Sequence, residues 1–323
     1  MTIIKNVNIV SQEEQTMRLD RWFKIHHPQL SYVMLQKLLR SGQIRLDGKR
    51  AKANVNLTIG QEIRVPPNLM QNLLESPKIL TLSKEQEALR KMTLYEDEKL
   101  LVLNKPYGLA VQGGSGIERH VDSMLEALRN KKGEKPRLVH RLDKDTSGVL
   151  VVAKTRSAAS FLAAAFRGRE AKKIYWSLVR GTPKPHEGKI STWLVKEATE
   201  HGDKVRVCKH GQVGADHAVS YYKLLETAGQ NLSWLEMQPF TGRTHQLRVH
   251  AAFINHPIIG DPKYFCADTN WCFPGGIQNR LHLHARRLIM PHPSGGKLDV
   301  TADLPAHMVQ SFNLLGFDKT AFA

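Results

Sequence analysis

The feature that most constrains the fold is a polar stretch that follows Pro66-Pro67 and has no hydrophobic period. Proline lacks the backbone donor that helices and sheets require, and such a stretch is typical of a linker. A chain of 323 residues is long enough to bury more than one hydrophobic core. We therefore predict a small domain over residues 16–70, a linker over 71–90 and a larger domain over 91–312.

The small domain has the pattern of two helices followed by a hairpin. The apolar side chains within residues 19–23 recur at helical spacing. Ser31 is suited to cap a second helix, whose apolar residues recur in the same way. Asp47-Gly48, placed after alternating apolar residues, is a strong signal of a two-residue hairpin turn.

The larger domain mixes short β-type runs with helical segments. Residues 157–169 carry the clearest helical stripe, and residues 265–278, rich in glycine, proline and polar residues, are predicted to be a surface insertion. Because strands and helices do not alternate regularly, the pattern favours an α+β fold. The apolar runs that predict strands are Leu100–Leu103, Val149–Ala153, Ile174–Val179, Val219–Leu224 and Trp234–Met237.

The charge of the chain points to a polyanionic partner. Lys plus Arg outnumber Asp plus Glu by 47 to 30, which gives a formal net charge of +17. Nucleic acid is the commonest partner of such a protein, and a basic surface without a specific partner is the alternative. Apolar residues make up 41% of the chain, which argues against a disordered protein.

The cysteines and histidines give no sign of a disulfide framework or a metal site. Cys208, Cys266 and Cys272 form no C-x-x-C pair, which favours a reducing compartment, and we expect a cytoplasmic protein. The sequence shows no signal peptide at its start and no apolar run long enough to span a membrane. His282 and His284 alternate with leucines, and we predict exposed strand histidines there.

The densest group of chemically useful side chains lies at residues 138–148, directly before the apolar run 149–153. Loops that a rigid strand holds often carry catalytic groups. The spacing of Asp143 and Asp145 partly matches a calcium loop, but Lys154 stands where that loop needs a bidentate Glu. Three interpretations remain: an Mg²⁺-dependent aspartyl-phosphate enzyme, a single catalytic carboxylate acting on RNA, and a structural turn.

Two further segments are more polar than an ordinary core element. Residues 241–250 hold two arginines, a histidine and a glutamine, and arginine can pair bidentately with a carboxylate or a phosphate. A solvated basic helix is the alternative. In residues 173–181, Tyr175 alternates with apolar positions on a predicted strand, where it can stack on a base or simply fill the core.

Together these segments resemble the RluA family of pseudouridine synthases. The resemblance covers about residues 15–310 and rests on four motifs in order: H-R-L-D-K-D-T-S-G at 140–148, K-x-Y-x-x-L-V-x-G at 173–181, G-R-T-H-Q-L-R-V-H at 242–250 and L-H-A at 283–285. The stretch from Asn104 to Gly116 is similar to the branch that acts on large-subunit ribosomal RNA. The small domain resembles an S4 RNA-binding domain.

The resemblance implies a larger domain built on a mixed, largely antiparallel sheet with flanking helices. It also implies isomerisation of uridine to pseudouridine without a cofactor or metal. The expected partner is 23S ribosomal RNA or a precursor of the large ribosomal subunit, and we expect a monomer with no membrane partner. The alternatives are another ribosomal or transfer RNA site, a phosphatase that uses an Asp nucleophile, and an S4-type RNA-binding or assembly protein without catalysis.

The resemblance further implies roles for single side chains. Asp143 is the nucleophile, and it attacks either the ribose C1′ or the uracil C6. Arg141 fills the space of the base, which must flip out of structured RNA at a cost of about a few kcal/mol. Tyr175 stacks on the flipped uracil and assists proton removal from C5. Arg243 pairs with Asp143 and keeps it charged, with Arg248 as the alternative for this role.

The remaining implied contacts are with the base and the RNA backbone. Leu283 is expected to pack against the flipped base. The small domain is expected to contact phosphates without sequence preference. The residues implied for these phosphate contacts are Arg18, Lys37, Arg40 and Arg45.

Overall fold

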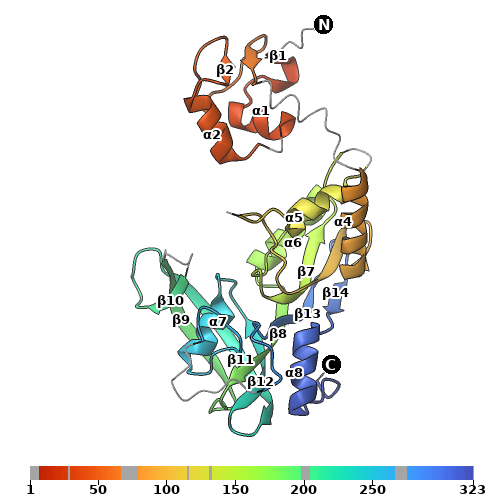
Figure 1. The fold of residues 1–323 in the computed structure, drawn as a ribbon, viewed down its shortest axis with the longest axis vertical. Helices are drawn as coiled ribbons and strands as arrows, with labels where there is room; N and C mark the ends of the chain where they lie inside the picture. The colour runs from red at the N-terminus through yellow and green to blue at the C-terminus, as the bar shows by residue number, and fades with distance from the viewer. Residues whose placement is uncertain are drawn as a thin grey trace. The chain divides into compact units, whose positions relative to one another are not determined.

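The computed structural model describes residues 7–27, 30–66, 79–114, 116–130, 133–197, 204–265 and 275–322. The chain divides into two compact units, Met1–Thr81 and Leu82–Ala323 (Figure 1). Helix α4 (Ile79–Met92) begins at this division. It occupies the second part of the range that we predict to be a linker, and its Leu89 is buried in the core of the larger unit. Residues 71–78 of the predicted linker lie outside the described residues.

The smaller unit folds around a core of its own, in which Leu19, Trp22 and Leu38 are buried side by side. Its three strands form one antiparallel sheet in the order β1-β3-β2. In chain order its elements are β1 (Val7–Ile9), the 3-10 helix η1 (Gln12–Glu14), α1 (Leu19–His26), α2 (Tyr32–Arg40), β2 (Arg45–Leu46) and β3 (Glu62–Arg64).

The sequence signals of this unit are confirmed. The Ser31 hydroxyl accepts a hydrogen bond from the Met34 backbone N–H at 3.2 Å and so caps α2. Asp47 and Gly48 both have positive φ, 48° and 73°, as a two-residue turn after β2 requires. The Asp47 carboxylate also accepts a hydrogen bond from the Glu62 backbone N–H at 2.7 Å, which ties the turn to β3.

The larger unit is built on one eleven-stranded mixed sheet, as the α+β prediction requires. Nine of these strands follow one another in the order β10-β9-β11-β12-β8-β13-β7-β5-β4, while β14 pairs with β13 and β6 with β7. All pairings are antiparallel except that of β13 with β7. The strands are β4 (Thr93–Glu96), β5 (Leu100–Lys105), β6 (Arg137–Leu138), β7 (Ser147–Ala153), β8 (Lys172–Arg180), β9 (Glu187–Glu197), β10 (Lys204–Cys208), β11 (Asp216–Ala228), β12 (Leu232–Pro239), β13 (Leu283–Pro291) and β14 (Lys297–Thr301).

Helices cover both faces of the sheet near β7, which explains the unbroken apolar run there. Val149 and Val151 face one core together with Leu162 of α6, while Leu150 and Val152 face another. This second core also takes in side chains of α4 and α5. Besides α4, the helices of this unit are α5 (Val121–Met124), the 3-10 helix η2 (Leu125–Leu128), α6 (Arg156–Arg167), α7 (Gln246–Phe253) and α8 (Ala306–Leu315) (Figure 1).

The prediction of exposed histidines at 282 and 284 is wrong, because β13, which begins directly after His282, lies between β8 and β7 in the interior of the sheet. Both side chains are fully buried. His284 Nδ1 lies 2.8 Å from the Ser147 hydroxyl, and His282 Nε2 lies 2.8 Å from that of Ser311. Burial lowers the pKa of His284 to about 3 and that of His282 to about 4, so both imidazoles are neutral and structural.

Three smaller features complete the fold. Cys208 is a free, half-buried thiol, and the other two cysteines lie outside the described residues. So does most of the predicted insertion at residues 265–278, of which 266–274 are not described. Among the helices that the structure describes, none is long and apolar enough to cross a membrane.

Candidate active site

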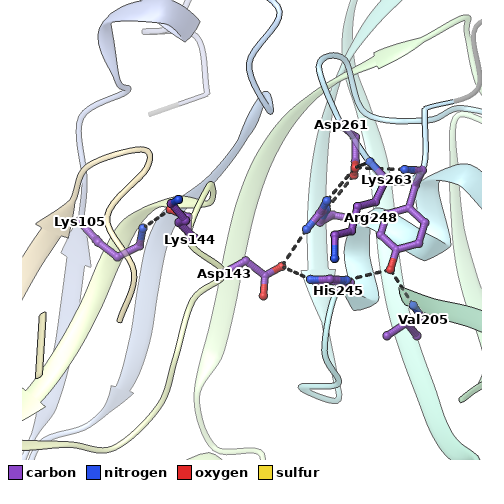
Figure 2. Close-up of polar contacts among 9 residues, drawn as sticks. Lys105, Asp143, Lys144, Val205, His245, Arg248, Asp261 and Lys263 are labelled. Carbon is purple, nitrogen blue, oxygen red and sulfur yellow. Dashed lines mark hydrogen bonds and ion pairs between the residues drawn. The ribbon is translucent and has the colours of Figure 1, made fainter. Parts of the chain in front are cut away.

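Asp143 lies on the loop that leads into β7, and the fold anchors this loop from two sides. The Gly108 backbone N–H donates to the carbonyl oxygen of Lys144 at 3.1 Å. The Lys105 ammonium donates to the same oxygen at 2.9 Å (Figure 2). At the end of the loop, Gly148 has φ +111°, and a Cβ there would lie 2.2 Å from the carbonyl oxygen of Ala285. Only glycine allows β7 and β13 to approach so closely.

Lys105 is a fully buried side chain that anchors the Asp143 loop. Its Nζ donates to three carbonyl oxygens, those of Pro106 at 3.0 Å, Leu109 at 2.7 Å and Lys144 at 2.9 Å. Burial lowers the pKa of Lys105 to about 7, and the negative charges of Asp145 and Asp143 oppose this shift. Three acceptors match the three protons of an ammonium group, so the protonated form holds the loop best.

A buried arginine connects Asp143 to a second carboxylate. The Arg248 guanidinium donates to both oxygens of Asp261, with Nε–Oδ2 and Nη2–Oδ1 distances of 2.7 Å. Its remaining nitrogen, Nη1, lies 3.5 Å from Asp143 Oδ2 (Figure 2). The side chains of Arg248 and Asp261 are 5% and 0% exposed, and that of Asp143 is 21% exposed. A bidentate pair of this kind fixes the guanidinium in one orientation.

The surroundings of Arg248 keep it charged. Burial alone would lower the pKa of Arg248, but its bonds with Asp261 and the charge of Asp143 outweigh burial and raise it. Asp261 is in turn held by the backbone N–H groups of Lys263 and Tyr264, at 2.9 and 3.2 Å. The Arg248 guanidinium therefore presents a positive charge to Asp143 from a fixed position.

The structure gives the partner of Asp143 as Arg248 and not Arg243, which corrects the pairing expected from the sequence. Arg243 precedes α7 on an exposed loop, where its Nη1 lies 3.3 Å from Asp216 Oδ1 and its Nε donates to the His217 carbonyl oxygen. Arg248 lies within α7, on the side that packs into the unit. The two arginines therefore point to different partners although they share one motif.

The other polar residues of α7 hold the motif in place. The Gln246 amide donates to the Val219 carbonyl at 2.9 Å and to the Ser220 hydroxyl at 2.8 Å, and its oxygen accepts from the Arg243 backbone N–H. His250 bridges two hydroxyls, with its Nδ1 2.9 Å from Ser220 Oγ and its Nε2 3.0 Å from that of Thr192. The alternative of a solvated basic helix is wrong, because residues 246–251 are all buried.

Asp143 opens onto a pocket of about 560 Å³, which is within the usual range for small-ligand sites. Tyr175 of β8 and Leu283 of β13 contribute to its wall, so the structure brings three predicted residues together. Burial, and then the charge of Asp143, raise the pKa of Tyr175, so its phenol stays protonated. Arg141 and Arg243, the other two predicted site residues, also line this pocket, and both are exposed.

The side chains around the Asp143 loop do not favour the calcium or Mg²⁺ interpretations of this loop. Ser147, which would be a ligand in a calcium loop, lies on β7 and bonds His284. Asp143 faces Arg248, which competes with any cation for its charge. In the part of the chain that the structure describes, no three His, Cys, Asp or Glu side chains gather as metal ligands would.

The residues expected to contact phosphates in the smaller unit are held to different degrees. Lys37 and Arg40 are exposed on α2. Arg18 forms an ion pair with Asp20 next to it. The Arg45 guanidinium donates to the carbonyl oxygens of Gly42 and Gly48, at 3.2 and 3.0 Å, and so supports the hairpin. Lys37 and Arg40 are thus the two whose charge faces solvent most freely.

Comparison with known proteins places this site in a family. A family model described as RNA pseudouridylate synthase matches residues 99–253. The chain is 37% identical to ribosomal large subunit pseudouridine synthase C of Escherichia coli (strain K12), over 90% of this chain and 89% of the relative. It is 34% identical to RNA pseudouridine synthase 4, mitochondrial, of Arabidopsis thaliana, over 91% and 78% of the two chains. The chain belongs to the RluA family of pseudouridine synthases.

A solved structure agrees with this membership. The human RNA pseudouridylate synthase domain containing 4 superposes with a TM-score of 0.62 at 31% identity, covering 74% of this chain and 98% of that one. The predicted fold class is therefore confirmed, and the chain is an RNA-modifying isomerase. The matched range of the family model includes Asp143, Tyr175 and Arg248 of this pseudouridine synthase, while Asp261 and Leu283 lie beyond it.

Sequence reasoning gave no role to four residues of this synthase that the structure places around the Asp143 loop. Asp261, His245 and Tyr264 surround Arg248 or Asp143, and Lys105 anchors the loop. A weak signal existed for one of them, because Gly260-Asp261 directly follows a buried apolar pair. The others become visible only when segments far apart in sequence meet.

Proposed function

We propose that the carboxylate of Asp143 is the nucleophile of this pseudouridine synthase. One observation carries the proposal: among the described residues that line the pocket, Asp143 is the sole carboxylate, and it faces the guanidinium of Arg248. A carboxylate can attack without a general base when a neighbouring cation keeps it ionised. The bidentate bond of Arg248 to Asp261 keeps that cation in place before substrate binds.

The reaction balances with this single group. In the C1′ route, an oxygen of Asp143 forms a bond to C1′ of the ribose while the bond from C1′ to N1 of uracil breaks. The freed uracil turns so that C5 faces C1′, the C5–C1′ bond forms, and the carboxylate leaves. A proton departs from C5 and one is gained at N1, so no electrons enter or leave. In the alternative route, the same oxygen adds to C6 of the base.

The pocket suits a nucleotide that has left its helix. Enzymes that act on a base inside structured RNA extrude it into a fitted site, at a cost of about a few kcal/mol. Tyr175 and Leu283 offer the base an aromatic and an aliphatic surface within the pocket. Arg141 is exposed at the pocket and is the side chain that we assign to the vacated space in the RNA.

The state of Tyr175 limits what it can do. Because burial raises its pKa, the free enzyme holds a neutral phenol there and not a phenolate base. We therefore assign Tyr175 first to stacking on the uracil. A role in taking the proton from C5 requires that its pKa fall when the RNA binds.

We further propose that the substrate is large-subunit ribosomal RNA, modified at more than one site. The curated relatives named ribosomal large subunit pseudouridine synthase C are 33–37% identical to the chain over 90–93% of its length. A formal net charge of +17 suits a large folded polyanion. A separate basic unit extends the surface available to RNA beyond a single stem-loop.

Mapping of pseudouridine tests both parts of the proposal. Purified protein is incubated with ribosomal RNA and with transfer RNA in EDTA, and pseudouridines are located by carbodiimide modification and primer extension. We expect new pseudouridines in large-subunit RNA without any divalent cation. The same mapping in a deletion strain identifies the sites in the cell. Loss of a transfer RNA modification with unchanged ribosomal RNA would overturn the substrate and leave the role of Asp143 standing.

A further inference from the structure

His245 lies beside the proposed nucleophile and has no role so far. It is the residue before α7, and its backbone adopts φ 52° and ψ 17°, a left-handed conformation that is uncommon for residues other than glycine. Its side chain lines the pocket and is 13% exposed. Strained residues of this kind are concentrated at functional sites, and the strain here aims an imidazole at Asp143.

Two contacts define the orientation of the imidazole. Its Nδ1 lies 2.8 Å from the hydroxyl oxygen of Tyr264, and its Nε2 lies 3.8 Å from Asp143 Oδ2 (Figure 2). The Tyr264 oxygen also accepts a hydrogen bond from the Val205 backbone N–H at 2.9 Å. His245 thus stands between a tyrosine hydroxyl and the carboxylate.

These contacts determine which nitrogen carries the proton. Burial raises the pKa of Tyr264 to about 12, so its hydroxyl is protonated, and among the hydrogen bonds of the described residues Nδ1 of His245 is the one acceptor for it. Burial also lowers the pKa of His245, which favours a neutral ring. If Nδ1 accepts, the single ring proton sits on Nε2 and points toward Asp143. The opposite tautomer would direct a lone pair at the carboxylate.

Both neighbours of Asp143 reach the same oxygen atom. Arg248 Nη1 and His245 Nε2 lie 3.5 and 3.8 Å from Oδ2. Over the described ranges, no hydrogen bond or ion pair engages Oδ1. The carboxylate is therefore held through one oxygen while the other is left for the substrate.

We propose that His245 is a positioning residue: Tyr264 fixes it as the neutral Nε2–H tautomer, which holds Oδ2 of Asp143 and leaves Oδ1 as the attacking oxygen. The inference rests on the proposed role of Asp143 as nucleophile. The 3.8 Å separation closes to a hydrogen bond when RNA fills the pocket and excludes water. A neutral donor suits this task, because it orients the carboxylate without adding a second positive charge to that of Arg248.

The first test reads the tautomer directly. The full-length protein is labelled with ¹⁵N-histidine, and a long-range ¹H–¹⁵N spectrum is recorded at neutral pH. The chain has 15 histidines, so the His245 signals are assigned as those missing from a His245→Asn spectrum. We expect a pyridine-like Nδ1 and a pyrrole-like Nε2, and a mixture of tautomers in Tyr264→Phe. A pyrrole-like Nδ1 in the unaltered protein overturns the inference.

The second test separates the side chain from the backbone strain. Asparagine tolerates the left-handed region but is too short to reach Asp143, whereas the glutamine amide nitrogen reaches the place of Nε2. We expect kcat of His245→Asn to fall about thirtyfold with KM within about twofold, and His245→Gln to recover most of that loss. Equal kcat in the Asn variant and the unaltered enzyme, or a change confined to KM, overturns the inference.

The two tests also distinguish this inference from the proposed function. If the Asp143→Asn enzyme still turns over substrate, Asp143 is not the nucleophile, and both the proposed function and the positioning role of His245 are overturned. A reversed tautomer with an inactive Asp143→Asn enzyme overturns the role of His245 alone. The melting temperatures of His245→Asn, His245→Gln and Tyr264→Phe are measured as a control. Values near that of the unaltered protein show that a loss in kcat does not come from unfolding.

Discussion

The pocket and the smaller unit both carry positive charge, but they hold it in opposite ways. Arg248 is buried, bonds Asp261 through two nitrogens and faces Asp143 with the third. Lys37 and Arg40 of the smaller unit extend from α2 into solvent. A charge in a dry, fixed environment stabilises one charge distribution strongly, whereas exposed side chains gain little from any single contact but adapt to many phosphates. The comparison suggests that the pocket governs kcat and the smaller unit governs affinity.

Arg243 stands between these two extremes. Its side chain is 41% exposed, and it pairs with Asp216, whose side chain is 59% exposed. Such a pair is worth little because water screens it. Arg243 nevertheless lines the pocket, so its charge is available to RNA at the entrance.

The largest effect is expected for Asp143→Asn, which should abolish turnover and leave RNA affinity within a few-fold. The amide has nearly the shape of the carboxylate but cannot form the covalent bond. Single-turnover rates and filter-binding affinities on one ribosomal RNA fragment measure the two quantities. Residual activity above a few percent of that of the unaltered enzyme would show that Asp143 is not the nucleophile.

The next effect is expected for Arg248→Ala, with a loss of kcat of at least about a hundredfold. This change also leaves Asp261 buried without its partner, which costs about 3–5 kcal/mol of stability. Urea unfolding measures the stability and single-turnover kinetics the rate. The double variant Arg248→Ala/Asp261→Asn is the control: stability should recover while activity does not. Recovery of both would mean that Arg248 is structural.

A smaller effect is expected for Arg243→Ala, a several-fold rise in KM with kcat and stability nearly unchanged. Its charge faces solvent and a weak ion pair, so we expect it to contribute to binding of RNA and not to the positioning of Asp143. Steady-state kinetics at two salt concentrations measure the effect. If Arg243→Ala is instead inactive and Arg248→Ala is not, the roles of the two arginines must be exchanged.

The smallest effect on turnover is expected for Lys37→Ala/Arg40→Ala, which should leave kcat unchanged. Each lost phosphate contact lowers the slope of log affinity against log salt by about 0.7–0.9, so the slope should become shallower by up to about 2. Lys91→Ala/Lys297→Ala, which removes two exposed charges from the larger unit, is the matched control. An equal slope in both double variants would show that the smaller unit has no special part in binding RNA.

The sequence allowed prediction of those features that depend on neighbours in the chain. The loop of Asp143 was found because an unbroken apolar run follows it, and the hairpin at Asp47 because its turn is local. The sequence could not show whether Arg243 or Arg248 pairs with Asp143, because Asp143 and Arg248 are 105 residues apart. The direction in which α7 begins also depends on the left-handed backbone of His245. Asp261 and Tyr264 were missed for the same reason: their partners lie in other elements.

The buried histidines show a second limit. Alternation of polar and apolar residues usually indicates a strand with one face exposed to solvent. At β13 the same alternation occurs in the interior of the sheet, where hydroxyls of Ser147 and Ser311 satisfy His284 and His282. Periodicity reports the polarity of side chains, but whether a partner exists for a buried polar group depends on contacts across the whole unit.

The place of β13 in the sheet also determines how late in synthesis the sheet and the pocket can be completed. This strand pairs with β7 on one side and β8 on the other, although it is made long after both. Until residues 283–291 leave the ribosome, β7 and β8 have no strand to join them, and Leu283 is missing from the pocket. Such distant pairings form slowly and late in folding. We therefore expect the pocket to be complete only after residues 283–291 have been made and have joined the sheet.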